Sequence, residues 1–208
     1  MSLWGRAFAA FYDRMLKGSE RAGLRERRRE LLAGAQGRVL EIGAGTGLNL
    51  DLYPPALGEL VLTEPEEPMA RRLERRLAAS GRAATVVRVG GEALPFPDNS
   101  FDTVVCTLVL CTVGDQAGTL RELRRVLKPD GRLLFLEHVR SEDPKIARRQ
   151  DRIDPLWVRI GHGCRCNRDT LAAIGTAGFV VGDLEHGRLP KAAEFVKPLI
   201  VGSASPRD

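Results

Sequence analysis

A short glycine-rich segment has the residue types and spacing of a loop that binds a nucleotide-like ligand. It runs Glu41-Ile42-Gly43-Ala44-Gly45-Thr46-Gly47, at the end of an apolar stretch that begins at Arg38. Glycines let the backbone turn sharply and let a ligand lie against bare peptide groups. The spacing is GxGxG, whereas the dinucleotide fingerprint GxGxxG needs its third glycine at Leu48. The segment therefore predicts a ligand-binding loop and argues against a nicotinamide or flavin ligand.

Two acidic residues stand where a bound ribose and a bound base would need them. Glu64 follows the apolar stretch 60–63, and a carboxylate there can accept hydrogen bonds from both hydroxyls of a ribose. The alternative is an acid favoured by the dipole of the following helix. Glu92 lies in Gly91-Glu92-Ala93-Leu94. The small residues suit the edge of a flat base, and the apolar residue suits its face. The acid can accept a hydrogen bond from an exocyclic amine.

His138 is the histidine best placed to act as a general base. It follows the apolar stretch 132–137, an expected strand, and a base at a strand's carboxyl end can reach a bound acceptor. The alternative interpretation is a packed or solvated histidine at a strand end.

A second group of chemically capable residues forms the pattern His162-x-Cys164-x-Cys166. Zinc sites take four ligands, usually from paired motifs, and the sequence shows no second pair. Cys106 and Cys111 approach this pattern only if the late segment folds over the fourth strand. We therefore expect no metal, and leave substrate contact and ordinary packing open.

In the elements that must position these residues, apolar residues follow either a helical or a strand-like spacing, and the two kinds of element alternate along the chain. Helical spacing occupies 3–16, 19–33, 66–80, a segment from 115 to a turn at 128–131, and 167–177. Strand-like stretches occupy 38–42, 60–63, 84–89, 101–107, 132–137, 179–186 and 194–202, while 141–166 is polar and shows no clean period. This alternation predicts an α/β fold with an open, mostly parallel sheet covered by helices on both faces. Ligands bind such sheets at the carboxyl ends of the strands.

Composition narrows the classes of protein further. The 208 residues are 43% apolar and 28% charged, which suits one globular domain with a core that needs no disulfide. No apolar run approaches the ~18 residues of a membrane span, and Arg6 and Asp13 interrupt the stretch a signal peptide needs. The net charge is +5, but the basic residues have helical spacing with acids among them, which favours solvated helix faces. Four cysteines fit a reduced, cytoplasmic setting.

Taken in order, these motifs resemble those of the class I S-adenosylmethionine-dependent methyltransferases. The matching segments are 41–47, Glu64, 94–102 and 123–131, and they cover roughly residues 36 to 140. Within that class, 104–111 and 161–170 resemble the methyltransferase-like 7 group, which is associated with thiol methylation. The quinone and menaquinone C-methyltransferases share the central motifs. The resemblance implies a Rossmann-like fold whose seven-stranded, mostly parallel sheet has an antiparallel last strand.

The resemblance also implies the cofactor S-adenosylmethionine, with S-adenosylhomocysteine as product. Glu41 and the loop 43–47 resemble the part that holds the methionine end, and Glu64 resembles the ribose ligand, although Asp is more common there. The expected adenine contacts are Pro65, Met69, Gly91, Glu92, Ala93 and Leu94. The residues expected beneath the sulfonium are Thr107 and Leu108.

The expected activity is methyl transfer to a small, apolar acceptor, with thiol sulfur preferred. A thiol of pKa about 8.5 ionises with little help, whereas an alcohol or carbon acceptor needs a base such as His138. A quinone-type ring carbon and a lipid amine are alternatives of the same class. An NAD-binding oxidoreductase and a non-catalytic cofactor-binding module are alternatives of other classes. Base amines of nucleic acids are not expected, because Cys106-Thr-Leu-Val109 replaces the Asn/Asp-Pro-Pro-aromatic motif.

We expect one domain over 1–208: a helical lid at 1–33, a cofactor-binding core at 36–140, and an acceptor-side segment with the last strands at 141–208. The candidate acceptor contacts are Tyr12, Cys111 and His162. The first helix carries five apolar residues at one helical spacing: Trp4, Phe8, Phe11, Tyr12 and Met15. It is interpreted as a packed helix, as a lid over the strand ends, or as a weak peripheral membrane contact.

Overall fold

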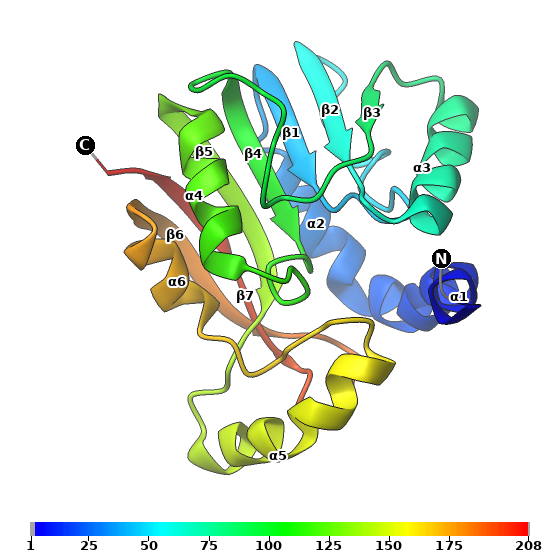
Figure 1. Ribbon diagram of the computed structural model, residues 1–208, viewed down its shortest axis with the longest axis vertical. Helices are drawn as coiled ribbons and strands as arrows, with labels where there is room; N and C mark the ends of the chain where they lie inside the picture. The colour runs from blue at the N-terminus through cyan, green and yellow to red at the C-terminus, as the bar shows by residue number, and fades with distance from the viewer. Residues whose placement is uncertain (1–2, 208) are drawn as a thin grey trace.

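A computed structural model describes residues 3–207 as an α/β protein built on one seven-stranded sheet (Figure 1). The strand order is β3-β2-β1-β4-β5-β7-β6. Neighbours from β3 to β5 run parallel, and β7 is antiparallel to both β5 and β6. The strands are β1 (Arg38–Ile42), β2 (Glu59–Thr63), β3 (Thr85–Val87), β4 (Phe101–Thr107), β5 (Leu127–His138), β6 (Phe179–Arg188) and β7 (Pro198–Pro206). The expected fold class is confirmed.

Helices cover both faces of the sheet (Figure 1). Apolar residues of α2 and α3 pack in one buried cluster, which we call the α2 face, and those of α4 and α6 pack in another, the α4 face. The helical elements are α1 (Leu3–Ser19), the π-helical turn η1 (Glu20–Leu24), α2 (Arg25–Leu32), α3 (Glu67–Ser80), α4 (Gln116–Val126), α5 (Pro144–Ile160) and α6 (Thr170–Thr176). None of these described helices is long and apolar enough to cross a bilayer.

Strand alternation decides which functional residues share a face. In β4, Val105 belongs to the α2 face and Cys106 to the α4 face. Because successive side chains point to opposite sides of a sheet, Thr107 returns to the α2 face. The same rule puts Glu41 of β1 and His138 of β5 on that face. Three chemically capable side chains therefore meet at one edge, and Cys106 is turned away from them.

The segment 141–166, expected to be irregular, contains the helix α5, so that expectation is wrong. Asp143 caps the helix by accepting a hydrogen bond from the Lys145 N–H at 2.7 Å, and Pro144 occupies the first turn. The helix lies below the strand ends in Figure 1. It buries only Ala147 and Gln150, because it crosses an edge instead of packing flat on the sheet. Its apolar residues do recur at helical spacing, at Ile146, Ile153, Trp157 and Ile160, but charged residues and Pro155 stand among them.

Other boundaries differ by a few residues. The expected turn at 128–131 lies within β5 as an irregularity, because Leu127 pairs with Phe101 while Arg132 pairs with Thr103. The last strand begins at Pro198, later than the expected 194. These differences leave the strand order unchanged.

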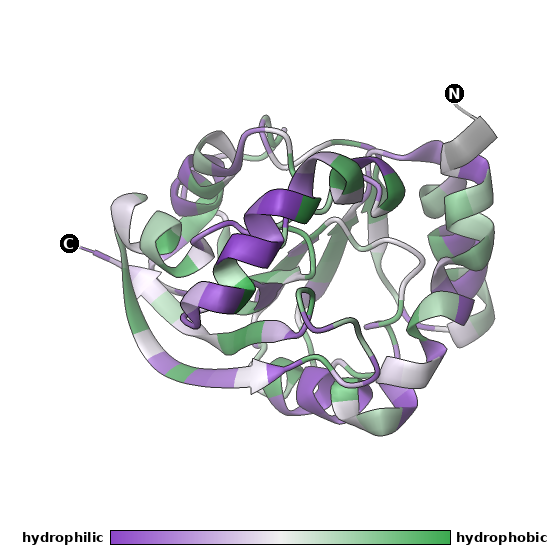
Figure 2. Ribbon diagram, turned by 90° about the horizontal axis from the view of Figure 1, so that it is seen from below, coloured by the Kyte–Doolittle hydropathy of each residue, from purple (hydrophilic) through white to green (hydrophobic). Residues whose placement is uncertain are grey.

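The apolar residues of α1 do not form one buried face. Phe11 and Met15 are 56% and 59% exposed, whereas Phe8 and Tyr12 are half-buried. The side chain of Trp4 lies outside the described residues. Along α1, apolar and polar residues alternate (Figure 2). The expected single face is therefore corrected to an inward pair and an outward pair.

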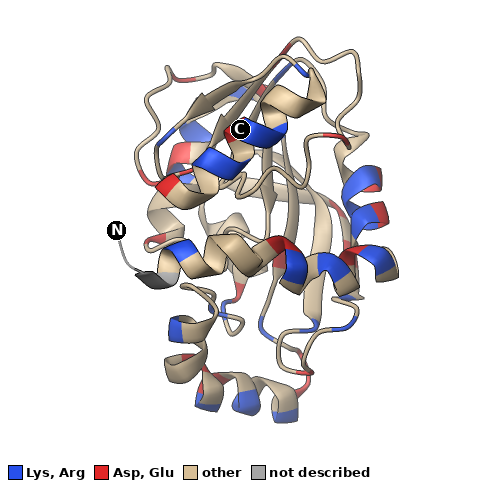
Figure 3. Cartoon of the chain, turned by 90° about the vertical axis from the view of Figure 1, so that its right-hand side faces the viewer, with Lys and Arg blue, Asp and Glu red and all other residues tan. Residues whose placement is uncertain are grey.

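Exposed helix faces carry charges of both signs (Figure 3). Arg71 of α3 pairs with Glu67 at 2.6 Å, and Arg88 pairs with Glu74 at 2.8 Å. Such exposed pairs contribute little to stability. These basic residues lie on solvated faces, as expected.

Arg28 of α2 departs from that pattern, since only 2% of its surface is exposed. Its guanidinium donates to Glu20 Oε1 at 3.1 Å, Asn49 Oδ1 at 3.0 Å and Thr107 Oγ1 at 2.8 Å. Asn49 Nδ2 donates to Thr107 Oγ1 at 2.9 Å and to Glu41 Oε1 at 2.8 Å. We call these five residues the Arg28 network. It joins the N-terminal helical segment to the carboxyl ends of β1 and β4.

We expect Arg28→Met to lower the free energy of unfolding by about 2–4 kcal/mol, because it leaves buried Asn49 Oδ1 without its donor and the Glu20 carboxylate, 13% exposed, without its cation. Arg29→Met is the matched control, since Arg29 lies on the same helix with its side chain 49% exposed. Its effect should stay within about 0.5 kcal/mol. Urea unfolding followed by circular dichroism measures both. Equal losses in the two variants would contradict a structural role for the network.

Candidate functional site

The glycine loop after β1 turns sharply, and its glycines have different reasons to be there. All three have a positive φ: 56° at Gly43, 59° at Gly45 and 83° at Gly47. A Cβ on Gly43 would lie 2.6 Å from Val109, and one on Gly47 would lie 2.8 Å from Leu73. A Cβ on Gly45 would meet nothing nearer than 3.9 Å. Gly45 therefore faces open space, which is where a ligand can lie against the backbone.

Glu64 stands beside that open space and holds the loop. Its Oε2 accepts the Gly45 N–H at 2.9 Å, and its Oε1 accepts the Glu66 N–H at 2.9 Å. Burial raises the pKa of Glu64 to about 7, and the two backbone hydrogen bonds oppose that rise. Each carboxylate oxygen keeps a further lone pair. The group can therefore accept two more hydrogen bonds, as a ribose diol requires.

Glu41 lies beneath the loop, not on its surface. Tyr53 Oη donates to Glu41 Oε2 at 2.7 Å, and Asn49 donates to the other oxygen. Burial raises the pKa of Glu41, while these donors and Arg28 oppose the rise. The rest of the loop is also tied down, since the Ala44 N–H donates to Thr63 O at 2.8 Å. Glu41 thus fixes the floor of the loop.

The segment after β4 carries local backbone strain. Leu108 has φ +59°, which is uncommon outside glycine and clusters at functional sites. Its N–H donates to Leu136 O at 2.8 Å, which holds it at the end of β5. Thr107, directly before it, is buried and accepts from the Arg28 network. Both residues therefore lie at the carboxyl edge, beside the glycine loop.

The residues expected around an adenine divide between buried and exposed positions. Met69, Gly91 and Leu94 are buried, and Pro65, Glu92 and Ala93 are exposed. The Glu92 carboxylate accepts the Gly114 N–H at 3.2 Å. It faces the loop after β4, where a base edge would have to compete with that backbone group.

The N-terminal helix closes over the glycine loop. Thr46 Oγ1 donates to Asp13, and Arg76 of α3 donates to the same carboxylate at 2.7 Å. The ring of Tyr12 approaches Gly45, since a Cβ there would lie 4.0 Å from Tyr12 Cε1. Burial raises the pKa of Tyr12, so its hydroxyl stays neutral. Tyr12 is thus positioned to contact a ligand on the loop.

His162 joins the same wall from the other end of the chain. Its ring stacks on Phe8 with centroids 4.5 Å apart and planes 17° apart. Its Nε2 contacts the Glu66 carboxylate. The backbone N–H of Glu66 in turn donates to the Glu64 carboxylate. The late segment therefore meets α1 at this wall.

His138 and Cys111 are buried at the same edge of the sheet. His138 is 8% exposed, and its Nε2 is buried with no hydrogen-bond partner among the described residues. Its Nδ1 lies 3.8 Å from Cys164 Sγ, and Cys111 Sγ lies 3.8 Å from the same sulfur. The late segment does fold over the end of β4, and it brings Cys111, not Cys106, to the histidine.

Four buried polar residues that hold this edge together were missed by sequence reasoning: Arg28, Asn49, Tyr53 and Glu137. Arg28 stood among three other arginines, so no local signal separated it from a solvated face. Glu137 accepts N–H groups from Val109 and Leu110 at 2.9 and 3.0 Å, and burial raises its pKa to about 7. An acid inside an apolar strand was the available signal.

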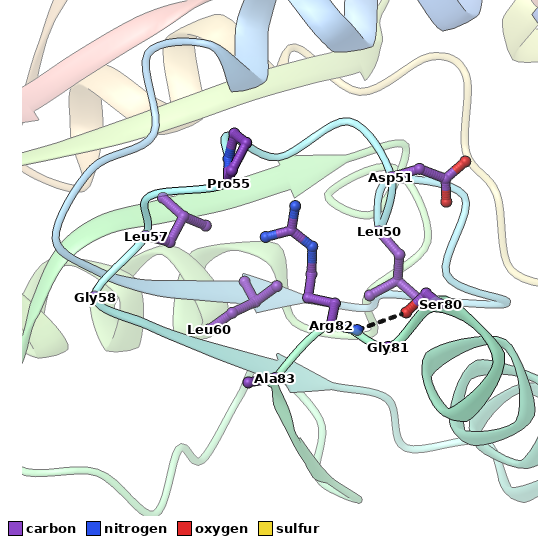
Figure 4. Close-up of a pocket in the computed structure, with 10 residues that line it drawn as sticks. All are labelled: Leu50, Asp51, Pro55, Leu57, Gly58, Leu60, Ser80, Gly81, Arg82 and Ala83. Carbon is purple, nitrogen blue, oxygen red and sulfur yellow. Dashed lines mark hydrogen bonds between the residues drawn. The ribbon is translucent and has the colours of Figure 1, made fainter.

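A hollow of about 430 Å³ lies away from this edge (Figure 4). Leu57, Gly58 and Leu60 line it at the amino end of β2, with Arg82 from beyond α3. The Arg82 guanidinium donates to Tyr53 O at 2.8 Å. The backbone N–H of Arg82 donates to Ser80 Oγ, shown dashed in Figure 4. The hollow is therefore not part of the site described above.

The strand order, the glycine loop after β1 and the acid after β2 together define a class I methyltransferase. Residues 40–135 match the family model described as a methyltransferase domain. Thiol S-methyltransferase TMT1A of Homo sapiens is 36% identical over 178 residues, which are 83% of this chain and 72% of TMT1A. Ubiquinone/menaquinone biosynthesis C-methyltransferase UbiE of Ectopseudomonas mendocina is 39% identical over 119 residues, which are 55% of this chain and 46% of UbiE.

Solved structures agree on the fold. A SAM-dependent methyltransferase of Thermotoga maritima, described as a possible histamine N-methyltransferase, has a TM-score of 0.71 at 22% identity, covering 99% of this chain and 98% of its own. This chain belongs to the S-adenosylmethionine-dependent methyltransferase family that includes thiol S-methyltransferase TMT1A. It is an enzyme whose cofactor is S-adenosylmethionine, which sets aside the oxidoreductase and non-catalytic alternatives.

The pKa of Glu64 leads to a pH prediction. Ribose hydroxyls that donate to its carboxylate favour the ionised form, so binding releases a proton and affinity rises as pH rises toward 7. From about pH 6 to about pH 8 we expect about a tenfold gain in cofactor affinity by calorimetry. Glu64→Gln should lose this gain while retaining the titration of the cofactor's own groups. The same slope in the variant and the wild type would remove Glu64 from the ribose.

Without cofactor, the contribution of Glu64 to the stability of the fold falls as pH rises, opposite to its contribution to cofactor affinity. The fold favours protonated Glu64, so its contribution to stability is fully present below the ordinary pKa of 4.5 and is lost as pH rises to about 7.

Proposed function

We propose that this enzyme transfers the methyl group of S-adenosylmethionine to the sulfur of a small, apolar thiol. The observation that carries the proposal is the similarity to a thiol S-methyltransferase across most of the chain. The aromatic wall built from Phe8, Tyr12 and His162 supports an apolar acceptor.

The cofactor supplies a methyl group on a sulfonium sulfur, which is already an activated leaving group. The chain's part is to hold and align it. Glu64 would accept the ribose hydroxyls, and the open face of Gly45 would receive the methionine end. The segment 91–94 with Pro65 and Met69 would border the adenine, and Thr107 with Leu108 would lie beneath the sulfonium. Alignment of this kind lowers the barrier by several kcal/mol or more.

The acceptor would enter between α1 and the late segment. Phe8 and Tyr12 lie with ring centroids 5.5 Å apart, and Phe8 stacks on His162. These rings exclude water from the strand ends, which strengthens electrostatic interactions inside the site. Cys111 and His138 line the deeper part. The N-terminal segment is therefore proposed to act as a lid.

A histidine of the chain can accept the proton of the thiol. A few per cent of a free thiol is ionised at neutral pH, and a base increases that fraction. His138 Nε2 is buried and has no hydrogen-bond partner among the described residues, so it is free to take the proton. His138 is proposed as the general base on this ground.

A panel of acceptors tests the proposed substrate class. We expect small apolar thiols to release S-adenosylhomocysteine at least about tenfold faster than quinones or lipid amines of similar size. A ring carbon is the second candidate, because UbiE shares the central part of the chain. Faster turnover of a quinone would favour that candidate and overturn the thiol assignment.

The lid makes a separate prediction. Phe8→Ala should lower kcat by about tenfold or more without changing cofactor affinity, because it opens the wall over the acceptor. Phe11→Ala is the matched control, since Phe11 lies on the same helix and is 56% exposed. Steady-state kinetics and calorimetry separate the two effects. If both variants turn over like the wild type, α1 is a packed helix and not a lid.

A further inference from the structure

Three elements bring two thiols and an imidazole together on the acceptor side. Cys111 comes from the loop after β4, His138 from the end of β5, and Cys164 from the segment after α5. Cys164 Sγ lies 3.8 Å from Cys111 Sγ and 3.8 Å from His138 Nδ1. The three ligand atoms all lie within 4.8 Å of one another. Residues far apart in sequence therefore converge on one point.

The backbone around this point is fixed from several directions. Glu137 accepts the N–H of Cys111 at 3.4 Å as well as those of the two preceding residues. The Arg165 N–H donates to Cys111 O at 2.8 Å. Gln150 Nε2 donates to Val139 O at 3.0 Å, directly beyond His138. The cluster is thus held in place by hydrogen bonds that do not use its own side chains.

Ordinary packing accounts for the cysteines but not for the histidine. Buried free cysteines commonly behave as small apolar residues, and Cys111 and Cys164 are 1% and 7% exposed. His138 is 8% exposed, its Nε2 has no hydrogen-bond partner among the described residues, and its Nδ1 contacts only a sulfur at 3.8 Å. A buried polar group satisfied this poorly costs stability. A ligand at Nδ1 would replace that weak sulfur contact and fix the proton on Nε2, which keeps no partner among the described residues.

Two of the three separations match a metal ion that prefers sulfur and nitrogen. Tetrahedral Zn²⁺ has bonds of about 2.3 Å to sulfur and about 2.0–2.1 Å to nitrogen, which puts neighbouring sulfurs about 3.8 Å apart and sulfur and nitrogen about 3.6 Å apart. Both separations from Cys164 Sγ fit this geometry. Two thiolates and a neutral imidazole would also balance the charge of the ion, so the buried site would be neutral overall.

We propose that Cys111 Sγ, His138 Nδ1 and Cys164 Sγ bind a Zn²⁺ ion. Three protein ligands with a fourth position left open are typical of catalytic zinc sites. Cys166 Sγ is 3.7 Å from Cys164 Sγ but lies outside the three-atom group. The sequence pattern argued against a metal because no second paired motif was visible, and the fold supplies the other ligands from separate strand ends.

If the proposed function holds, the fourth coordination position of the ion binds the acceptor thiol. An acceptor thiol bound there releases its proton to solvent, and its sulfur attacks the methyl carbon of the cofactor. The bond from that carbon to the sulfonium sulfur breaks, and the products are S-adenosylhomocysteine and a methyl thioether. In this arrangement His138 is a ligand of the Zn²⁺ ion and not a general base. The ion, and not a base, lowers the pKa of the acceptor thiol.

Metal content and cobalt spectroscopy test the site without relying on activity. The full chain is reduced, stripped with a chelator, and titrated with Zn²⁺ or Co²⁺. We expect a single ion per chain and the intense charge-transfer absorption of Co²⁺ bound to thiolates. Cys164→Ala should weaken Zn²⁺ binding by more than about 100-fold, since even outer partners of metal ligands are worth about 10- to 100-fold. Cys106→Ala, a buried cysteine on the opposite face, should leave it unchanged.

The outcomes separate this inference from the proposed function. A folded, reduced wild-type chain that binds neither ion and shows no cobalt–thiolate absorption overturns the metal site, whether or not the variants fold. Equal weakening in both variants also overturns it. Thiol turnover that survives complete removal of zinc rejects the role of the ion and leaves thiol methylation with His138 as base. Metal binding without turnover of any thiol rejects the proposed function and leaves the metal site.

Discussion

The burial of one positive charge organises the functional edge of this protein. A guanidinium with 2% exposure is stable only if its donors are satisfied, and Arg28 satisfies them with groups from three places: the turn before its own helix, the loop after β1 and the end of β4. Asn49 extends the same set of hydrogen bonds to Glu41. The segment from Glu20 through α2 therefore cannot shift far without leaving an unpaired ion.

The other polar groups of the edge use that fixed frame. Two buried carboxylates, Glu64 and Glu137, accept backbone N–H groups and so hold the glycine loop and the loop after β4. Burial raises the pKa of each to about 7. Their anchoring hydrogen bonds favour the ionised form, and burial favours the neutral one. The loops that border the proposed cofactor and acceptor positions are thus held by groups that respond to pH.

The acceptor side depends on which face each strand-end residue adopts. His138 and the loop that carries Cys111 meet on the α2 face, where the late segment adds Cys164. Cys106 is only five positions from Cys111 in sequence but packs on the α4 face. The period of two along a strand separates them. Chemistry on the acceptor side is therefore concentrated on one face, beneath the aromatic wall of α1.

The sequence by itself determined the alternation of strands and helices, the class of fold, the glycine loop and Glu64, because each depends on contacts between near neighbours or on a local motif. It did not reveal α5, a mostly exposed helix with many charged residues and an internal Pro155, nor the inward turn of Arg28 among exposed arginines. It also did not show that α1 splits its aromatic residues between the site and solvent. The meeting of Cys111, His138 and Cys164 required the tertiary structure, because three separate chain segments reach one point only when the sheet has formed.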